Sequence, residues 1–407
     1  MTNTIGKGNE PRIFIGLHEI ANIGATYNKA FRALGIQTHI VMRERNPYFT
    51  HEQYDVVIAD RLLKMSDGPR FFKPIRFLLQ ELFVFVEFVK ALFLYDVFIF
   101  IYGSSFFLWN YFDYPILKFF KKKIVCAFCG CDVRHWSAFD QEFESLGLNI
   151  SSLSVCKQCD TKSICRLREK VRTVQFSERY SELILSQRTM SQLLTMPYMR
   201  INVPLALDEY EFNIPARDVP VVIHAPTSRT IKGTDYILAA VDQLKREGVK
   251  FEFRIIEQTN NLELRKILTD SDIVVDFLFI QTVGVLALEA MATGNAVLSG
   301  VMKDYELIPN GCPVVAITHD NVYENLKRIV LDKTFRLSLA IAGRKFVETY
   351  HDHIKVARQI LGWLEPGGIE KYDYYPDFAE KYYRLPNDLL KKEQFYLIED
   401  TIRFLRR

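Results

Sequence analysis

Hydrophobic residues along the chain form short continuous runs that alternate with stretches of helical periodicity. In the first half, β-branched and aromatic runs predict buried strands over residues 12–17, 38–42, 55–59, 97–102 and 124–128. A loop with Asn22 and Gly24, and a helical pattern that ends near Gly35, separate the first two runs. This β-loop-α-β order is typical of an open parallel sheet of the doubly wound type.

The second half shows the same alternation. A β-branched strand beginning at Val221 runs into a basic loop, and an amphipathic helix follows over residues 236–247. Gly294 is the C-cap signal of the next predicted helix. Further runs predict a strand over residues 273–280, a helix over 285–293 and a strand over 296–299.

Length and composition indicate more than one core. At 407 residues and 49% hydrophobic content, the chain exceeds a typical single domain. The polar, Pro-containing stretch 205–218 separates the two patterned halves, and Pro366 with the two glycines after it breaks the chain again. We therefore predict an N-terminal domain over residues 1–215, a second domain over 216–365 and a C-terminal segment over 366–407.

The helix predicted over residues 285–293 carries one carboxylate, Glu289, among apolar neighbours. The residues three or four positions away are Val285, Leu286, Ala292 and Thr293, so Glu289 shares no polar stripe with solvent. Burying an unpaired carboxylate is costly, so this side chain needs a partner. Two interpretations are open: hydrogen bonds from a ligand diol at the strand-to-helix turn, or a buried ion pair with a distant Arg or Lys.

The basic loop after the strand at Val221 contains Arg229, Lys232 and Gly233. Arg offers planar bidentate donors and Lys a mobile point charge, while Gly233 lets backbone N–H groups near a helix start approach phosphate oxygens. Such a loop has the groups that are needed to bind a diphosphate. The alternative is that both cations are simply solvated, as Arg and Lys in loops usually are.

Together these segments resemble the C-terminal half of a retaining glycosyltransferase of family 4. Residues 289–294 match the Glu-Ala-Met-Ala-x-Gly end of the family's Glu-x7-Glu pattern, and Gly284 matches an internal glycine. The first Glu of that pattern falls on Gln281, while Arg229 and Lys232 match the family's diphosphate-binding residues. The resemblance implies the GT-B fold, in which two Rossmann-like doubly wound parallel-sheet domains face a central cleft.

The resemblance also implies roles for residues of the second domain. Glu289 would bind the ribose hydroxyls of a nucleotide sugar, and Gln281 would hold the sugar by hydrogen bonds without carrying a charge. Backbone groups of the turn would assist, at Thr282, Val283 and Gly284. Arg229 and Lys232 would stabilise the leaving diphosphate in place of a metal ion. The segment 366–407 would return over the first domain, as it does in GT-B proteins.

Two further candidates lie in the first domain. By the resemblance, the loop at Gly24 faces the donor phosphates, although a plain turn glycine is an equal alternative. Asp132 follows a strand end, in a stretch similar to the His-Gly-Ser-Asp-x-Arg of one branch of the family, and would orient a hydroxyl or cap the next helix. That stretch matches at Gly130, Asp132 and Arg134, and departs at Cys129 and Cys131.

The cysteines raise a structural metal as an alternative to reduced thiols. Cys156, Cys159 and Cys165 have the spacing C-x2-C-x5-C, so they are candidate ligands of a structural zinc ion. Three more cysteines lie upstream, at Cys126, Cys129 and Cys131. No catalytic metal and no cofactor is predicted.

Residues 71–95 hold much of the aromatic content. Their polar residues form one narrow helical stripe and leave a wide apolar arc, which either packs into the first domain or lies in a membrane interface. Basic residues near this arc would meet anionic lipid in the second case, namely Arg70, Lys73, Arg76 and residues 121–123. The longest uncharged run nearby, 97–112, is too short to span a bilayer, so no transmembrane helix is predicted.

The net charge and the motifs that the sequence lacks exclude several other functional classes of protein. A net charge of +3 gives no reason to expect nucleic acid as a partner. The polar N-terminus lacks a secretory signal, so we expect the protein in the cytoplasm or at the inner face of the membrane. No Gly-x-Gly-x-x-Gly after a strand and no P-loop pattern occurs, which removes support for dehydrogenases and NTPases.

These patterns lead to one predicted function and one alternative. The prediction is a retaining, metal-independent hexosyltransferase-like enzyme that moves a sugar from a UDP- or GDP-sugar to a hydroxyl of a glycan or lipid-linked acceptor, in bacterial-type surface polysaccharide or glycolipid synthesis. The alternative is a catalytically silent GT-B scaffold protein in a glycan assembly complex, which Gln281 and Cys129 favour.

Overall fold

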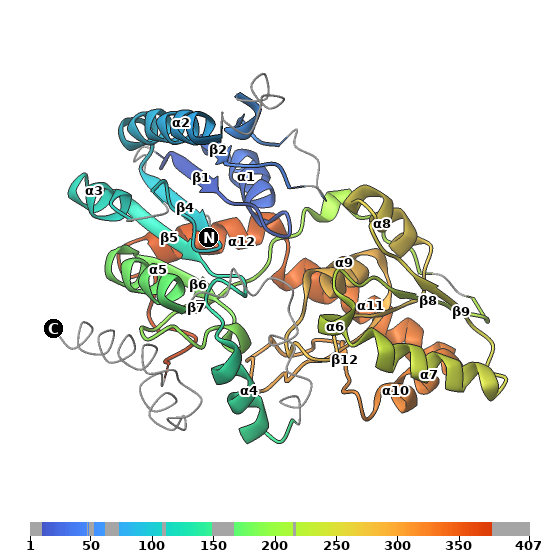
Figure 1. Cartoon of the computed structure of the whole chain (residues 1–407). Coiled ribbons are helices and arrows are strands. Elements are labelled where there is room, and N and C mark those ends of the chain that lie inside the picture. The colour runs from blue at the N-terminus through green and yellow to red at the C-terminus, as the bar shows by residue number, and fades with distance from the viewer. Residues whose placement is uncertain are drawn as a thin grey trace, which may run out of the picture.

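The computed structural model describes residues 10–46, 48, 53–61, 73–107, 111–148, 167–214 and 217–376, which form two parallel sheets flanked by helices (Figure 1). The predicted fold class is therefore confirmed. The zinc candidates Cys156, Cys159 and Cys165 lie outside the described residues, as do residues 377–407 of the predicted C-terminal segment.

The first sheet has seven strands among the described residues, in the order β3-β2-β1-β4-β5-β6-β7, with every pair parallel. Because β1 pairs with β2 on one side and β4 on the other, the strand order reverses there, and such a reversal opens a crevice at the carboxyl ends of the strands. The strands are β1 Ile13–Leu17, β2 Thr38–Met42, β3 Val56–Val57, β4 Val97–Ile101, β5 Lys123–Ala127, β6 Leu183–Ser186 and β7 Met199–Arg200.

Alternate residues of β1 enter cores on opposite faces of this sheet, as strand geometry requires. Ile13 and Ile15 join a core that includes Tyr27 of α1. Phe14 joins the opposite core, where its ring lies 4.8 Å from that of Phe106. The helices of this half are α1 Ile23–Ala33, α2 Lys73–Leu94, α3 Asp113–Phe119, α4 Trp136–Ser145 and α5 Leu167–Tyr180, and α12 His353–Leu364 returns to pack on α1 (Figure 1).

The second sheet has the order β12-β11-β10-β8-β9 among the described residues, and its pairs are also parallel. Here the strand order reverses at β8, which lies between β10 and β9. Its strands are β8 Val221–His224, β9 Glu252–Ile255, β10 Ile273–Val275, β11 Ala296–Ser299 and β12 Val315–Ala316. Its helices are α6 Arg229–Lys232, α7 Thr234–Arg246, α8 Asn261–Thr269, α9 Val285–Thr293, α10 Val322–Leu331 and α11 Lys333–Tyr350.

One predicted strand of the second half is too long. The strand ends at Val275, and residues 276–284 form a loop in which the carbonyl of Phe277 accepts a hydrogen bond from the backbone N–H of Gly300. The helix after this loop has the predicted bounds. Its C-cap Gly294 has φ 97°, a left-handed conformation that favours glycine.

Three connections join the two halves. Phe139 and Phe143 of α4 belong to the core of the second sheet. The 3₁₀ turn Arg188–Met190, between β6 and β7, contacts the second half, where Thr189 N donates to Glu306 Oε2 at 2.8 Å. The 3₁₀ turn Leu207–Glu209 lies on the chain between the two sheets. At the second crossing, the N–H of Leu205 bonds the carbonyl of His351 at 2.7 Å, so the outgoing and returning chains run side by side.

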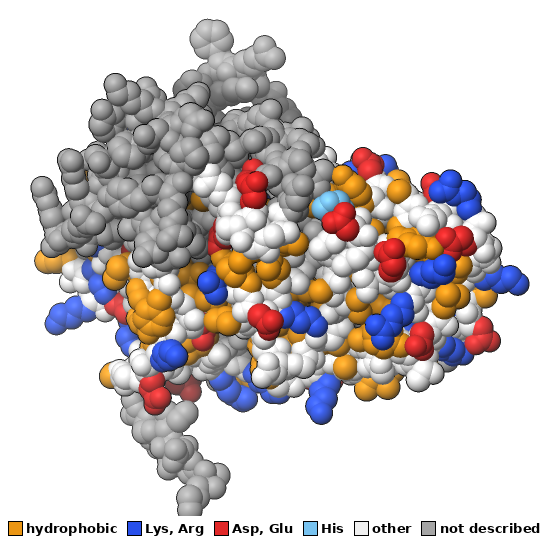
Figure 2. All heavy atoms as spheres, turned by 90° about the horizontal axis from the view of Figure 1, so that it is seen from below, with side chains coloured by type: hydrophobic (Ala, Val, Ile, Leu, Met, Phe, Trp, Pro, Cys, Tyr) orange, Lys and Arg blue, Asp and Glu red, His pale blue; other side chains and the backbone are white. Residues whose placement is uncertain are grey.

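The aromatic segment around α2 has two faces, as the sequence allowed. Val84, Phe88 and Leu92 are buried in the first domain's core, whereas Leu78, Leu82 and Phe93 are more than half exposed. Among the described residues, no helix is both long and apolar enough to cross a bilayer. The face seen from below mixes acidic and basic side chains over the half at the right, without one extended basic patch among the described residues shown (Figure 2).

Candidate functional site

Three neighbouring strands of the second sheet, β8, β10 and β11, end at one edge, which we call the second-sheet edge and define as residues 225–233, 276–284 and 299–300. Parallel sheets place their ligands at this kind of edge. The structure brings most of the predicted second-domain residues together there, namely Arg229, Lys232, Gln281, Thr282, Val283 and Gly284. Glu289 lies beyond the edge, in the second turn of α9.

Lys232 is buried at this edge and forms an ion pair with Asp276 Oδ1. Its Nζ also lies 3.8 Å from the centre of the Phe277 ring, in a cation–π contact. Asp276 is fully buried, and its second oxygen, Oδ2, has no hydrogen-bond partner among the described residues. The sequence reasoning missed Asp276, although an Asp directly after a buried strand was a usable signal.

Gly284 is required by the packing at the start of α9. A Cβ at this position would lie 2.2 Å from the Phe277 ring and 2.8 Å from Asp276 Oδ2, both far inside contact distance. No side chain caps α9 in the structure. The N–H groups of its first turn, and the positive end of its dipole, therefore lie beside Asp276 and favour negative charge.

Arg229 lies in different surroundings from Lys232. It is half exposed and forms a bidentate pair with Glu257, with Nε–Oε1 at 2.7 Å and Nη2–Oε2 at 2.9 Å. The two predicted diphosphate ligands thus each have a carboxylate partner, one at the surface and one in the interior.

Glu289 is buried and is held by two neutral donors rather than by a cation. Its Oε1 accepts hydrogen bonds from Tyr210 Oη and Asn261 Nδ2, both at 2.9 Å. No described Lys or Arg forms a direct ion pair with it, although the charge of Arg265, whose guanidinium lies 4.4 Å from the centre of the Tyr210 ring, also acts on Glu289. Burial raises the pKa of Glu289, and the two donors oppose that rise.

Several polar atoms at the second-sheet edge are buried without partners among the described residues: Asp276 Oδ2, Thr282 Oγ1 and Ser299 Oγ. Asp276 and Ser299 follow the paired residues Val275 and Leu298, so they occupy neighbouring positions on β10 and β11. Each such atom costs about 1 to 3 kcal/mol of folding free energy. A polar ligand at this edge would supply hydrogen-bond partners for all three atoms.

Gln281 is buried beside these atoms. Its Nε2 donates to the carbonyl of Leu278 at 3.1 Å and lies close to Gly300, where a Cβ would approach it to 3.0 Å. One hydrogen-bond donor of the Gln281 amide is therefore already bonded to a carbonyl of its own loop.

In the first domain, Gly24 lies at the start of α1, where its N–H donates to Glu19 Oε1 at 3.1 Å. Ala25 donates to the other oxygen of Glu19 at 2.9 Å. The carboxylate thus occupies the anion-binding end of α1, and the predicted contact between Gly24 and a donor phosphate would have to replace it. The sequence reasoning did not identify Glu19, because five residues separate it from the N–H that it binds.

Glu19 also predicts a pH dependence of stability. Burial raises its pKa from 4.5 to about 7. Between these values the unfolded chain loses the proton first, so this group increasingly disfavours folding as pH rises from about 4.5 to about 7, by up to roughly 3 kcal/mol. The melting temperature of Glu19→Gln minus that of wild type should therefore increase between pH 5 and pH 8. A difference that stays constant with pH would contradict this, and Glu211→Gln at the surface is the control.

The carboxylate of Asp132 accepts hydrogen bonds from the backbone of its own loop. Its Oδ1 accepts from Gly130 N at 2.7 Å, and both of its oxygens accept from Cys129 N at 3.2 Å. Burial raises its pKa to about 6. The carboxylate stabilises the turn after β5, and no described contact joins it to the second-sheet edge.

The cysteines that are described show no metal site. Cys126, Cys129, Cys131 and Cys312 are free thiols, and no group of three or more possible metal ligands occurs within the described ranges. Burial raises the pKa of Cys126 and Cys129, which keeps them as thiols.

Comparison with known proteins identifies the fold. No protein-family model matches the chain, and no curated protein is similar in sequence. Among solved structures, TarM of S. aureus aligns over 89% of this chain and 100% of its own, with a TM-score of 0.59 and 9% identity. A sucrose-phosphate synthase from Thermosynechococcus elongatus aligns over 86% of this chain and 97% of its own, with a TM-score of 0.56 and 14% identity. The fold is GT-B.

A third match is an alpha-glucosyltransferase in complex with UDP-glucose and DNA containing an abasic site. It aligns over 87% of this chain and 99% of its own, with a TM-score of 0.53 and 11% identity. At these identities the likeness concerns the GT-B fold, and membership of family 4 stays a prediction.

Proposed function

We propose that this GT-B protein is a retaining glycosyltransferase that takes a sugar from a UDP- or GDP-sugar and transfers it to a hydroxyl of a glycan or lipid-linked acceptor. The observation that carries the proposal is the set of buried polar atoms without partners at the second-sheet edge, next to a buried lysine and the uncapped start of a helix. Solved structures of the same fold include complexes with UDP and UDP-glucose, which supports a nucleotide donor.

In this reaction the bond from the anomeric carbon to the diphosphate oxygen breaks and a bond to the acceptor oxygen forms. Negative charge grows on the departing diphosphate, which takes up the proton of the acceptor hydroxyl. The positive groups at the second-sheet edge are Lys232, Arg229 and the first-turn N–H groups of α9. Fixed donors in a water-poor site stabilise such charge strongly, so no metal ion is required for this task. Retention of configuration follows the family resemblance, and no side chain is assigned as a nucleophile.

The ribose would bind at Glu289. Tyr210 and Asn261 fix Oε1 of this carboxylate, while Oε2 takes no hydrogen bond from the described residues. The free oxygen is suited to accept from a diol, and the two fixed donors keep the carboxylate oriented.

Glu289→Gln tests this role. The amide oxygen can still accept from Tyr210 and Asn261, but its NH₂ group cannot accept from ribose hydroxyls. Nucleotide affinity should fall by about 1 to 3 kcal/mol, measured by displacement of a fluorescent nucleotide. The melting temperature of the free protein should stay constant or rise, since a buried charge is gone. A large loss of melting temperature with unchanged affinity would make the carboxylate structural; Glu263→Gln on α8 is the control.

A donor screen tests the reaction itself. We expect one of UDP-glucose, UDP-N-acetylglucosamine or GDP-mannose to release its nucleoside diphosphate slowly in the presence of EDTA, because the positive groups belong to the protein. A requirement for Mn²⁺ or Mg²⁺ would contradict the charge argument. Release from none of these donors would favour the second candidate, a silent GT-B scaffold, which the carboxylate partners of both Arg229 and Lys232 make worth testing.

The exposed face of α2 indicates where the protein would contact its acceptor. Leu82 and Phe93 are exposed on the first domain, and the ring of Phe93 lies 5.9 Å from that of Phe120, the residue directly after α3. Phe119 is 82% exposed beside them, so the apolar surface continues from α2 to the end of α3. Such a surface, with exposed Lys90 and Lys121 nearby, fits the interface of an anionic membrane. Arg70 and the side chains of Lys73 and Arg76 lie outside the described residues.

Liposome sedimentation tests this surface. Wild-type protein should sediment with anionic vesicles at low salt and less as salt rises, since exposed charges are screened. Leu82→Ser with Phe93→Ser should reduce the bound fraction several-fold without unfolding the protein, because both side chains are already exposed. Leu331→Ser, an equally exposed residue on α10, is the matched control. If wild type remains in the supernatant at low salt, the acceptor is a soluble glycan.

A further inference from the structure

A continuous series of polar contacts connects the first domain to Glu289. Lys29 Nζ of α1 donates to Glu209 Oε1 at 2.7 Å, and Glu209 Oε2 accepts from Arg265 Nη1 at 2.6 Å. The guanidinium of Arg265 lies 4.4 Å from the centre of the Tyr210 ring. Tyr210 Oη in turn donates to Glu289 Oε1 at 2.9 Å. We call the residues that lead to Glu289 the linker network, which consists of Lys29, Glu209, Arg265 and Tyr210.

Helix α8 supplies two of the side chains that act on Glu289. Asn261 and Arg265 are four residues apart, so they lie on the same face of the helix. Asn261 Nδ2 donates to Glu289 Oε1 at 2.9 Å, and its backbone N–H donates to the carbonyl of Tyr48 in the first domain at 3.1 Å. The two donors to Glu289 are therefore each connected to the first domain.

Arg265 can act on Glu289 through the ring of Tyr210. Its side chain is 13% exposed, so solvent screens its charge only weakly. A guanidinium stacks on an aromatic face, which fixes the ring, and its positive charge polarises the phenol. In a buried network such polarisation strengthens the next hydrogen bond, which here is the bond from Tyr210 Oη to Glu289. Burial raises the pKa of Tyr210 well above its usual value, so the phenol keeps the proton that it donates.

The charged groups around Glu289 come from several elements. Burial raises the pKa of its carboxyl, whereas the bonds from its two donors and the charge of Arg265 lower that pKa. Asp276, directly after β10, opposes them through its like charge. Arg344 of α11 donates instead to the carbonyl of Ala292 at 2.9 Å. Among the described residues, Arg265 is therefore the cation that favours the ionised carboxylate, which is the form that accepts two hydroxyl protons.

We propose that Arg265 is a positioning residue for sugar transfer, which through Tyr210 holds the Glu289 carboxylate ready to accept the ribose hydroxyls. This role rests on the proposed nucleotide site at Glu289. Glu209 and Lys29 hold Arg265 in turn, so the first domain contributes to a binding site in the second.

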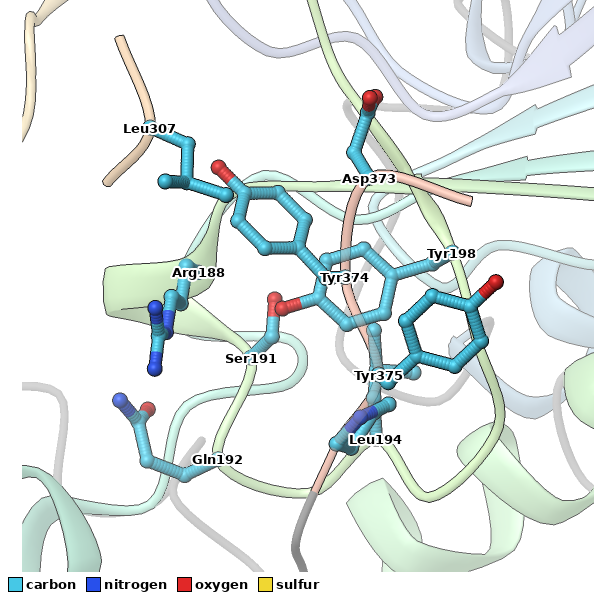
Figure 3. Close-up of a pocket in the computed structure, with 10 residues that line it drawn as sticks. Arg188, Ser191, Gln192, Leu194, Tyr198, Leu307, Asp373, Tyr374 and Tyr375 are labelled. Atoms are coloured by element: carbon cyan, nitrogen blue, oxygen red, sulfur yellow. The ribbon is translucent and has the colours of Figure 1, made fainter. Parts of the chain in front are cut away.

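The two halves also meet at a second junction, which supplies a matched control. It lies at a cavity of about 210 Å³ whose lining includes Arg188 and Tyr374 (Figure 3). There Thr189 N donates to Glu306 Oε2 at 2.8 Å, and Tyr374 Oη donates to the carbonyl of Glu306. None of these residues belongs to the linker network, so Tyr374→Phe removes a contact between the halves without changing a contact of Glu289.

The first experiment needs no nucleotide. The full chain is labelled with glutamate carrying ¹³C at the carboxyl carbon, and the Glu289 signal is identified by its absence in Glu289→Gln. In Arg265→Met, which removes the charge and keeps the length of the side chain, this signal should titrate at higher pH than in wild type. Arg265→Lys, which keeps the charge, should titrate close to wild type, and so should Tyr374→Phe. An unchanged titration in Arg265→Met would overturn the proposal.

A milder variant keeps the test valid where Arg265→Met does not fold. Tyr210→Phe retains the ring and removes the hydroxyl that donates to Glu289. The Glu289 signal should again titrate at higher pH, because a donor to the charged form is gone. If Tyr210→Phe leaves both this titration and nucleotide affinity unchanged, Arg265 does not act through Tyr210 and the proposal fails.

The second experiment is isothermal titration with UDP and GDP at neutral and at mildly acidic pH. Arg265→Met should weaken binding about five- to tenfold at neutral pH, and more at acidic pH, where more of its Glu289 is protonated. In the Glu289→Gln background the same change should alter affinity less than about twofold, because its effect passes through the carboxylate. Tyr374→Phe should also stay within about twofold of wild type.

The outcomes separate this role from the proposed function. An equal loss of affinity from Arg265→Met in both backgrounds, or an equal loss from Tyr374→Phe, would overturn the positioning role while leaving the nucleotide site in place. If wild type binds neither nucleotide, the proposed function fails and the ribose role of Arg265 fails with it, whatever the ¹³C titration shows.

Discussion

Arg229→Ala is expected to lower kcat/KM by on the order of a hundredfold while leaving the melting temperature nearly unchanged. The side chain is half exposed, and its pair with Glu257 is a surface ion pair, which contributes about 1 kcal/mol or less. Its loss therefore barely affects folding. In the reaction, however, its charge would act on the departing diphosphate. Steady-state kinetics with the best donor of the screen, together with thermal melting, measure both effects.

Two controls sharpen this prediction. Arg254 on β9 is another partly exposed arginine, paired with Glu252 at 2.6 Å and Asp270 at 3.7 Å and placed outside the second-sheet edge, so Arg254→Ala should leave kcat/KM unchanged. Glu257→Gln frees Arg229 from its partner and should maintain or raise kcat/KM. Full turnover by Arg229→Ala would remove this residue from the diphosphate site.

Lys232→Ala is expected to have the largest effect on stability of any change at the second-sheet edge. Removing the lysine leaves Asp276, which is fully buried, without its counter-charge. Breaking a buried pair in this way costs about 3 to 5 kcal/mol. Urea denaturation should therefore show a much lower midpoint with an unchanged slope.

A double variant separates the structural from the chemical role of Lys232. Lys232→Met with Asp276→Asn removes both charges and should recover most of the stability, because a neutral pair of similar size needs no counter-charge. Its kcat/KM should stay on the order of a hundredfold below wild type. If the double variant recovered activity as well as stability, Lys232 would serve folding alone.

The fold was predictable from the sequence because both sheets are parallel and buried, and such strands are recognised as continuous apolar runs between helical patterns. Gly294 marked the end of α9 for a local reason, since only the C-cap residue needs a left-handed backbone. The end of β10 was not predictable in the same way. Residues 277–280 are as apolar as the strand, and the contacts that hold them in a loop, such as the hydrogen bond from Gly300 N to the carbonyl of Phe277, come from another segment.

The candidate site was predictable only in part, because its partners come from distant segments. A carboxylate in an apolar helix revealed Glu289, but Tyr210 and Asn261 lie 79 and 28 residues away, and no spacing rule leads to them. The ion pair of Lys232 joins residues 44 positions apart and was missed for the same reason. The cap of Glu19 on α1 changes the expectation for Gly24, since it already uses that N–H.

Isothermal titration of the wild-type protein with UDP and with GDP, in buffer containing EDTA, tests the central claim most directly. We predict that one of the two nucleotides binds at one site per chain, and that Glu289→Gln weakens this binding roughly five- to a hundredfold. If neither nucleotide binds, the second-sheet edge is not a nucleotide-sugar site. If the variant binds as tightly as wild type, Glu289 does not hold the ribose.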